Sequence, residues 1–168
     1  FGIATARAEA DPAQPLIGAL TSQPVRHFAA MTDPQEFGGL LRAIDGYQGD
    51  PSVIYALRLT PHVFQRPGEV RQMEWAELDF DKAVWTIPVA KMKMRQPHFV
   101  PLSCQALAIL SAMRQLSGAG RYVFPLVRTN KRPISDNTIN AALRRMGYTK
   151  DQMTAHGFRT TASSLLNE

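Results

Sequence analysis

Apolar residues recur at helical spacing in the first part of the chain. After the capping residue and proline of Asp33-Pro34, apolar side chains follow the i, i+3, i+4, i+7 spacing of one helix face as far as Gly46. Asp50-Pro51 opens a second stretch that is apolar on most sides, with Pro61 near its end. The pattern predicts an amphipathic helix followed by a buried one, ended or kinked at Pro61.

Two more helical stripes follow in the second half of the chain. The first begins after Ser103, ends at Gly118 and Gly120, and turns inward a set of residues that comprises Ala106, Ile109, Leu110, Met113 and Leu116. The second is expected to be capped by Ser135-Asp136. A last helix opens at Thr154 and runs through the apolar and small residues up to Leu166.

Between residues 78 and 102 the pattern changes to the two-residue alternation of strands. Residues 78–81, 84–88 and 98–102 each read as a short strand, and the connection over residues 89–97 is basic. The sequence therefore predicts an α+β, mostly helical fold with a small three-stranded antiparallel sheet. Lys91, Lys93 and Arg95 alternate along the connection and share a face if its arms stay extended. Lysines that guard a solvated sheet edge are the alternative reading.

The first residues have a different character from the rest. Residues 1–10 are rich in alanine and indicate the end of a helix, and Pro12, Pro15 and Pro24 follow with little apolar periodicity. We expect residues 1–21 to be the end of a preceding domain with its linker, and residues 22–168 to form one domain. Because the chain opens on Phe1, we expect it to be a piece of a longer protein.

Charge is unevenly distributed along the 168 residues. Residues 1–90 hold seven Lys and Arg against eleven Asp and Glu, whereas residues 91–168 hold twelve against three. Such asymmetry favours a polyanionic partner for the second half, with nucleic acid as the first candidate. The single Cys104 excludes an internal disulfide, and no apolar run approaches the ~20 residues of a membrane span.

Cationic side chains stand out as candidate chemistry. His156 and Arg159 lie three positions apart and face the same way on a helix, where they form a clamp for an anion or an exposed cationic face. Arg66 precedes the break at Pro67-Gly68, and Glu69 falls in the first turn of a new helix. The basic half lacks the grouped carboxylates and the Cys/His clusters of metal sites, so metal-free phosphoryl transfer fits best.

Three motifs in order resemble the tyrosine recombinases, and prophage and genomic-island integrases in particular. They are Arg66-Pro67-Gly68-Glu69, Lys93 in the hairpin before Val100-Pro101-Leu102, and His156-Gly157-Phe158-Arg159. The resemblance extends from about residue 25 onward. It implies site-specific DNA recombination and integration through a 3′-phosphotyrosyl intermediate, without metal or cofactor.

The resemblance also implies a role for each matching position. Arg66 would be the first clamp on the scissile phosphate, with Glu69 as its structural support. Lys93 would be the general acid that protonates the leaving 5′ oxygen. His156 would assist proton transfer or brace the phosphate, and Arg159 would be the second clamp.

Further basic residues are expected to follow the DNA backbone. They are Lys91, Arg95, Arg128, Lys131, Arg132, Arg144 and Arg145. The implied partner is double-stranded DNA at attachment sites, bound by a homotetramer of the full-length protein, with this chain monomeric on its own. The implied location is the bacterial cytoplasm, at the nucleoid and not at a membrane.

The resemblance departs from the family at the nucleophile. In the family a further His or Trp and the attacking tyrosine follow the His-x-x-Arg motif, whereas every tyrosine here precedes it: Tyr47, Tyr55, Tyr122 and Tyr148. The chain ends at Glu168, so we expect a catalytic domain truncated before its nucleophile, which binds DNA without cleaving it. A non-catalytic DNA-binding remnant or regulator and a basic protein–protein adaptor remain as alternatives.

Overall fold

The computed structural model describes residues 28–92, 96–129 and 131–167. The helices are α1 (Pro34–Asp45), α2 (Pro51–Val63), α3 (Pro67–Arg71), α4 (Cys104–Ser117), α5 (Thr138–Arg145) and α6 (Gly157–Leu165). The strands are β1 (Leu78–Asp79), β2 (Val84–Ile87) and β3 (His98–Pro101), and two 3₁₀ turns cover Trp75–Glu77 and Val89–Lys91. The predicted mostly helical α+β fold is confirmed. The helix and linker expected within residues 1–27 lie outside the described residues, as does the predicted domain boundary.

Capping side chains fix the starts of three helices where the sequence predicted them. The carboxylate of Asp33 accepts hydrogen bonds from two amides of the first turn of α1, both at 2.8 Å. Asp50 does the same once for α2, at 2.9 Å, and the Ser103 hydroxyl accepts from an amide of α4 at 3.2 Å. The predicted cap of α5 is wrong, because the Ser135 hydroxyl is paired with the hydroxyl of Thr138, 2.8 Å away.

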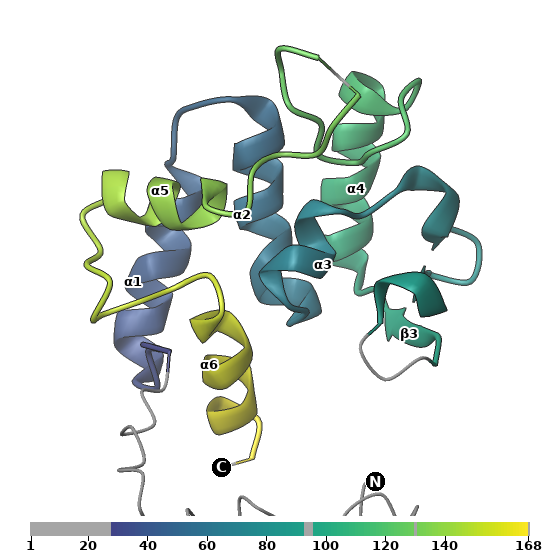
Figure 1. Cartoon of the computed structure of the whole chain (residues 1–168). Helices are drawn as coiled ribbons and strands as arrows, with labels where there is room; N and C mark the ends of the chain where they lie inside the picture. Colours follow the sequence, from purple (N-terminus) through teal and green to yellow (C-terminus); the bar gives the residue numbers. More distant parts are fainter. Residues whose placement is uncertain (1–27, 93–95, 130, 168) are drawn as a thin grey trace, which may run out of the picture.

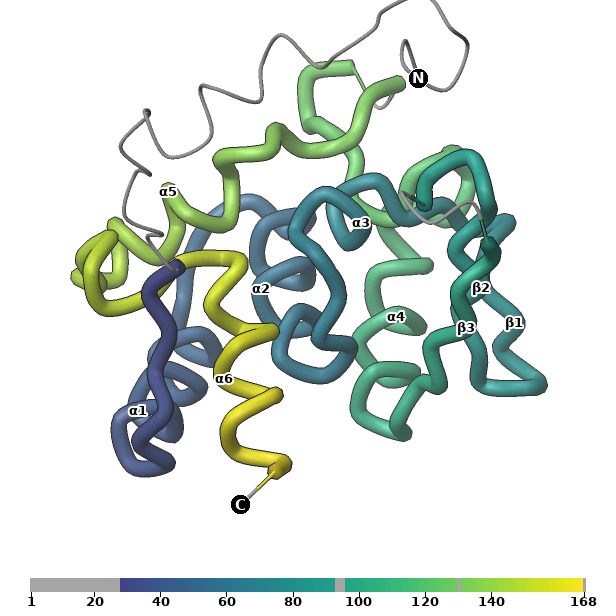
Figure 2. Tube along the Cα trace, turned by 60° about the horizontal axis from the view of Figure 1, so that its bottom comes forward, coloured from purple at the N-terminus to yellow at the C-terminus, as the bar shows by residue number. Residues whose placement is uncertain are grey.

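Helix α2 is the centre of the domain. It packs against α1, α3, α4, α5 and α6. Figures 1 and 2 show α1, α5 and α6 on one side of it and α4 with the sheet on the other. Its buried residues serve two apolar cores: Leu59 faces the core shared with α4 and the sheet, and Leu57 the core shared with α1 and α5. The predicted burial of this helix is therefore confirmed.

The end of α2 differs from the prediction. The helix continues past Pro61 to Val63, and the amide of Phe64 still donates to the carbonyl of Thr60 at 3.2 Å. Phe64 then ends the helix in the left-handed conformation, with a φ of 53°. Non-glycine residues adopt this conformation infrequently, so the turn that follows has a defined and constrained geometry.

The sheet is antiparallel with the order β1-β2-β3. Trp85 in the middle strand pairs with Leu78 on one side and Val100 on the other. Trp85 and Ile87 are fully buried and point into the core shared with α4. The expectation that Leu116 also points inward is wrong. Leu116 is exposed, because Ser117 takes the inward position at the end of α4 and donates its hydroxyl to the carbonyl of Val123 at 2.8 Å.

The connection between β2 and β3 is not extended at its start. Val89–Lys91 forms a 3₁₀ turn, so this arm is not extended at Lys91. Lys93 and Arg95 lie outside the described residues. Among the described helices, none combines the length and the apolar character that crossing a bilayer requires.

Candidate phosphate-binding site

Arg66 and Glu69 are joined at the start of α3. The buried carboxylate of Glu69 accepts from the Arg66 amide at 2.9 Å and from its guanidinium at 2.8 Å. The Glu69 side chain is 8% exposed, whereas that of Arg66 is 48% exposed. Pro67 sits in the first turn, where its ring suits the helix and its missing N–H costs nothing. The buried Glu69 carboxylate thus holds the guanidinium group of Arg66 in place at the surface.

His156 and Arg159 lie at the start of α6. The helix begins at Gly157, and the Thr154 hydroxyl accepts from the Gly157 amide at 3.0 Å, which is the capping contact that the sequence predicted for Thr154. His156 is half-buried just before the first turn, and Arg159 is exposed one turn later. Both side chains therefore belong to the same short, capped segment.

The guanidinium of Arg159 is held by main chain from a distant part of the sequence. One of its nitrogens donates to the carbonyl of Phe64 at 3.1 Å. Phe64 is the left-handed residue that ends α2, two positions before Arg66. The contact therefore links the end of α2, the Arg66 turn and the start of α6 at one place.

Two adjoining cavities meet at His156. One has a volume of about 590 Å³ and is lined by Arg66, Glu69 and His156 among others. The other, about 900 Å³, lies between the end of α2, β3 and α6, and His156 and Arg159 are in its lining. Three of the four side chains of the predicted catalytic set thus line one region, although Arg66 and Arg159 lie 93 positions apart in the sequence. The fourth, Lys93, lies outside the described residues.

Burial and nearby charge keep His156 neutral more readily than an ordinary histidine. Desolvation is the main cause that lowers its pKa, and the positive charges of Arg159 and Arg66 lower it further. The carboxylate of Glu69 acts in the opposite direction with a smaller effect. A neutral imidazole beside two guanidinium groups is able to take up a proton while the arginines bind an anion.

The segment before His156 is fixed by contacts that involve main-chain groups. The Ala155 amide donates to the side-chain oxygen of Asn140 at 2.9 Å. The guanidinium of Arg144 donates to the carbonyls of Met153 and Asn140. The DNA-contact role predicted for Arg144 is untested, but its half-buried guanidinium is occupied by these internal bonds. Neither Asn140 nor this use of Arg144 was recognised in the sequence, because the acceptors are carbonyls brought close by the fold.

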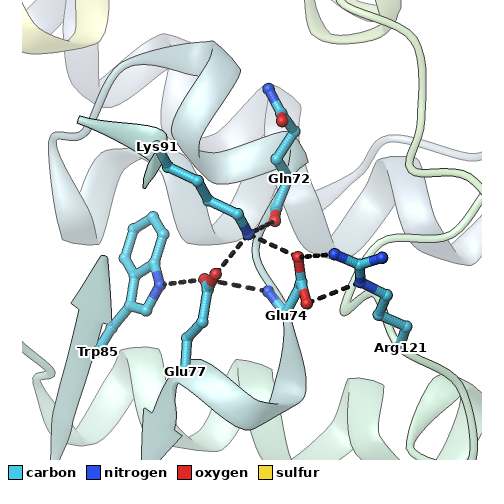
Figure 3. A network of polar contacts seen from close by, with 6 residues as sticks. All are labelled: Gln72, Glu74, Glu77, Trp85, Lys91 and Arg121. Atoms are coloured by element: carbon cyan, nitrogen blue, oxygen red, sulfur yellow. Dashed lines mark hydrogen bonds and ion pairs between the residues drawn. The ribbon is translucent and has the colours of Figure 1, made fainter. Parts of the chain in front are cut away.

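Lys91 lies in a polar network instead of on an open face (Figure 3). Its ammonium group donates to the carbonyl of Gln72 at 2.7 Å, to Glu74 at 2.8 Å, and to Glu77. Glu77 also accepts from the indole of Trp85 at 3.0 Å. Only 19% of the Lys91 side chain is exposed. The DNA contact predicted for Lys91 is untested. In the structure this lysine links the β2–β3 connection to the residues that follow α3.

Glu74 is the acidic centre of the same network. Two nitrogens of Arg121 donate to its carboxylate at 2.8 and 3.0 Å, and Lys91 donates to it from the other side. These contacts, with the Arg121 hydrogen bonds as the largest cause, lower the pKa of Glu74 to about 2. The Glu74 carboxylate therefore stays charged down to strongly acidic pH.

Replacing Lys91 by methionine is expected to lower the free energy of unfolding by about 2–3 kcal/mol. The change leaves Glu74 and Glu77 close together without the shared cation, and the loss of one partner from a largely buried ion pair is costly. Guanidinium denaturation of the chain measures the effect. Lys82→Met is the matched control: Lys82 pairs with Asp79 but is 80% exposed, so a change below about 0.5 kcal/mol is expected. Equal losses for the two variants would contradict the structural importance of the network.

The other predicted DNA-contact residues that the structure describes are exposed. Arg128, Lys131 and Arg132 are exposed on the loop between Pro125 and Pro133, two residues that pair with each other at its base. Arg145 is also exposed on α5. Within the described ranges, no group of three or more His, Cys, Asp or Glu is arranged to hold a metal ion.

Comparisons with known proteins agree on one family. The model of the Phage integrase family matches residues 34–168. The integrase of Enterobacteria phage P4 is 36% identical over 95% of this chain and 39% of its own length. The prophage integrase IntA of Escherichia coli (strain K12) is 45% identical over 61% of this chain and 25% of its own length. The chain spans less than half the length of these curated relatives.

A solved structure shares the fold. It is that of a lambda integrase tetramer bound to a Holliday junction, with a TM-score of 0.66 and 17% sequence identity. The match covers 98% of this chain and 50% of the integrase chain.

Proposed function

This chain belongs to the Phage integrase family of tyrosine recombinases, and from that premise we propose that it supplies the phosphate-binding and proton-transfer groups of a site-specific DNA integrase. The observation that carries the proposal is the gathering of Arg66, His156 and Arg159 around adjoining cavities. Arg66 comes from the start of α3 and the other two from the start of α6, and both segments are held by hydrogen bonds that do not involve a ligand. Such preorganised cations suit a reaction in which charge on phosphate oxygens must be stabilised.

The roles follow from the chemistry of each side chain. Arg66 and Arg159 bind the non-bridging oxygens of the scissile phosphate through their guanidinium groups. Glu69 keeps the Arg66 fork in place with the two hydrogen bonds described above. The neutral imidazole of His156 takes up the proton of the attacking hydroxyl or shares it with a phosphate oxygen. Lys93, whose role rests on its position in the motif, gives a proton to the leaving 5′ oxygen.

The reaction is a transesterification. The oxygen of a tyrosine forms a bond with phosphorus, the bond from phosphorus to the 5′ oxygen breaks, and a 3′-phosphotyrosyl link remains. Reversal with a different 5′ hydroxyl rejoins the strand without an external energy source. Positioning and charge neutralisation account for the catalysis, so the proposed reaction requires no metal or cofactor.

We propose that the attacking tyrosine is none of the four tyrosines of this sequence and lies elsewhere in the full-length protein. Tyr47 is buried in the core with α1, and Tyr148 packs against the same core. Tyr55 packs against the core on the other side of α2, and Tyr122 lies beside Arg121 with its ring 5.2 Å from the guanidinium carbon. None of the four lines either cavity at His156.

DNA is the proposed partner, and tetramer formation on it is proposed for the full-length protein only. The exposed cations of the Pro125–Pro133 loop and Arg145 would follow the phosphate backbone. Residues 1–21 would connect this domain to a further DNA-binding domain. A bacterial host is proposed because relatives come from Escherichia coli (strain K12) and Enterobacteria phage P4. A place at the nucleoid is proposed from the DNA partner.

The affinity of this chain for a duplex is expected to fall at least about tenfold when salt is raised fourfold, because even two phosphate contacts release that many counterions. Fluorescence anisotropy with a labelled duplex measures it. The combined variant Arg128→Ala, Lys131→Ala, Arg132→Ala should bind more weakly and with a shallower salt slope. Binding that is absent or insensitive to salt would support the protein–protein adaptor instead.

The same duplex with a nick near the scissile site separates the enzyme from a non-catalytic remnant. The 168-residue chain is expected to form no covalent adduct, whereas the full-length protein traps a phosphotyrosyl adduct on denaturing gels. An adduct with the short chain would contradict our placing of the nucleophile. Failure of the full-length protein to form one would favour the remnant or regulator.

A further inference from the structure

The segment Phe28–Met31, here called the strap, crosses the beginning of α6. The carbonyl of Ala29 accepts from the amide of Thr154 at 3.2 Å and from its hydroxyl at 3.1 Å. Met31 is buried in the same core as Phe158 of α6. The strap thus packs on residues two positions before and two positions after His156.

The fit between strap and helix is close enough to require a glycine. A Cβ atom at position 157 would lie 2.2 Å from the carbonyl oxygen of Ala29. That distance is far below any normal contact, and the atom it meets is main chain, which cannot rotate away. The close contact between the Ala29 carbonyl and Gly157, the residue after His156, therefore fixes the position of the strap on α6.

Phe28 places its ring directly against His156. The two ring centroids are 4.4 Å apart, with a tilt of 37° between the planes. Phe28 is 60% exposed, so its ring is not there to fill the core. The separation of the two rings is close to the range of distances typical of favourable ring pairs, so the phenyl ring occupies space beside the imidazole.

Charged groups also act on His156. The charges of Arg66 and Glu69 at the α3 turn and of Arg159 on α6 influence its imidazole, and Lys91 lines the same cavity as Arg66, Glu69 and His156. Phe28 forms an uncharged wall beside these charges. Without that wall the imidazole would gain solvent and freedom to rotate.

We propose that Phe28 is a positioning residue for the strand-cleavage reaction, holding the His156 imidazole in the orientation in which it faces the phosphate. The inference rests on the proposed function for its catalytic meaning. The strap provides the rigid support through the Ala29–Thr154 hydrogen bonds, and the phenyl ring provides the contact. In this role Phe28 acts through His156 and not on the reacting atoms.

The first test needs no DNA. NMR titration of the histidine rings in the 168-residue chain is expected to show that Phe28→Ala raises the pKa of His156, because water regains access to the charged form. Phe28→Leu should give part of this shift, and Phe28→Trp, which keeps an aromatic face, should give little. Leu116→Ala removes an equally exposed apolar side chain from the end of α4 and should leave the titration unchanged. An unchanged His156 pKa in Phe28→Ala would overturn the contact.

The second test uses the full-length protein on a nicked duplex. Phe28→Ala is expected to slow adduct formation about ten- to a hundredfold while DNA affinity stays within about twofold, because a misplaced group affects the reaction more than binding. The acid limb of its pH–rate profile should move to higher pH, and Phe28→Trp should restore most of the rate. A wild-type rate in Phe28→Ala would overturn the positioning role. If wild-type protein forms no adduct, the proposed function fails, whereas the titration still decides whether Phe28 controls His156.

Discussion

Full-length protein carrying Arg159→Ala is expected to cleave DNA at least about a thousandfold more slowly than wild type. Preorganised arginines that bind transferring phosphoryl groups contribute effects of this size. The guanidinium of Arg159 is already oriented by the Phe64 carbonyl, 3.1 Å away, so it meets the phosphate without reorganisation. Single-turnover adduct formation on a nicked duplex measures the rate.

Two further variants sharpen this experiment. Arg159→Lys keeps the positive charge but loses the guanidinium group, whose several donors can bind the Phe64 carbonyl and the phosphate at once. Most of the decrease in the cleavage rate should therefore remain. Arg42→Ala removes an exposed arginine from α1 and should have a rate close to wild type. Thermal unfolding of each variant checks that the fold is intact. Cleavage within tenfold of wild type by Arg159→Ala would remove this residue from the clamp.

Gly157→Ala is expected to lower the free energy of unfolding by about 2–4 kcal/mol, the upper range for overpacking. The added methyl group would meet the Ala29 carbonyl at 2.2 Å and the sulfur of Met153 at 3.1 Å. Relief requires the strap to leave Thr154, which breaks both hydrogen bonds to Ala29. Guanidinium denaturation of the 168-residue chain measures the loss.

A matched glycine gives the control for this variant. A Cβ at Gly68 in α3 meets no atom within 4 Å, so Gly68→Ala is expected to be neutral or to stabilise by up to about 1 kcal/mol. If Gly157→Ala loses stability by releasing the strap, the pKa of His156 should also rise in it, as in Phe28→Ala. Equal stability of the two alanine variants would show that the close approach at Gly157 is not real.

Local signals predicted most of the fold. Asp33, Asp50 and Ser103 each cap a helix where the sequence placed a start, because capping depends on a few neighbouring residues. The three strands were predicted from their alternation, and they form the predicted antiparallel sheet. An error arose where a contact outside the helix decides: at the end of α4, Ser117 turns inward to the carbonyl of Val123 in the following segment, and Leu116 is left exposed.

The site was predicted less completely than the fold. The motifs identified Arg66, His156 and Arg159, and the structure brings these side chains together. The sequence did not indicate that Lys91 would be occupied by two glutamates, since these lie 14 and 17 positions before it. It also gave no sign of the strap, because Phe28 approaches His156 only after the chain has folded.

The bond between Arg159 and the Phe64 carbonyl has a consequence for engineering. The acceptor is a peptide oxygen whose direction depends on the left-handed turn at Phe64, a conformation that costs a non-glycine residue about 1 kcal/mol or more. A designer who grafts these cations onto another scaffold would therefore have to transfer that turn as well. If the side chains alone were copied, the transplanted guanidinium group would lack the carbonyl that orients it.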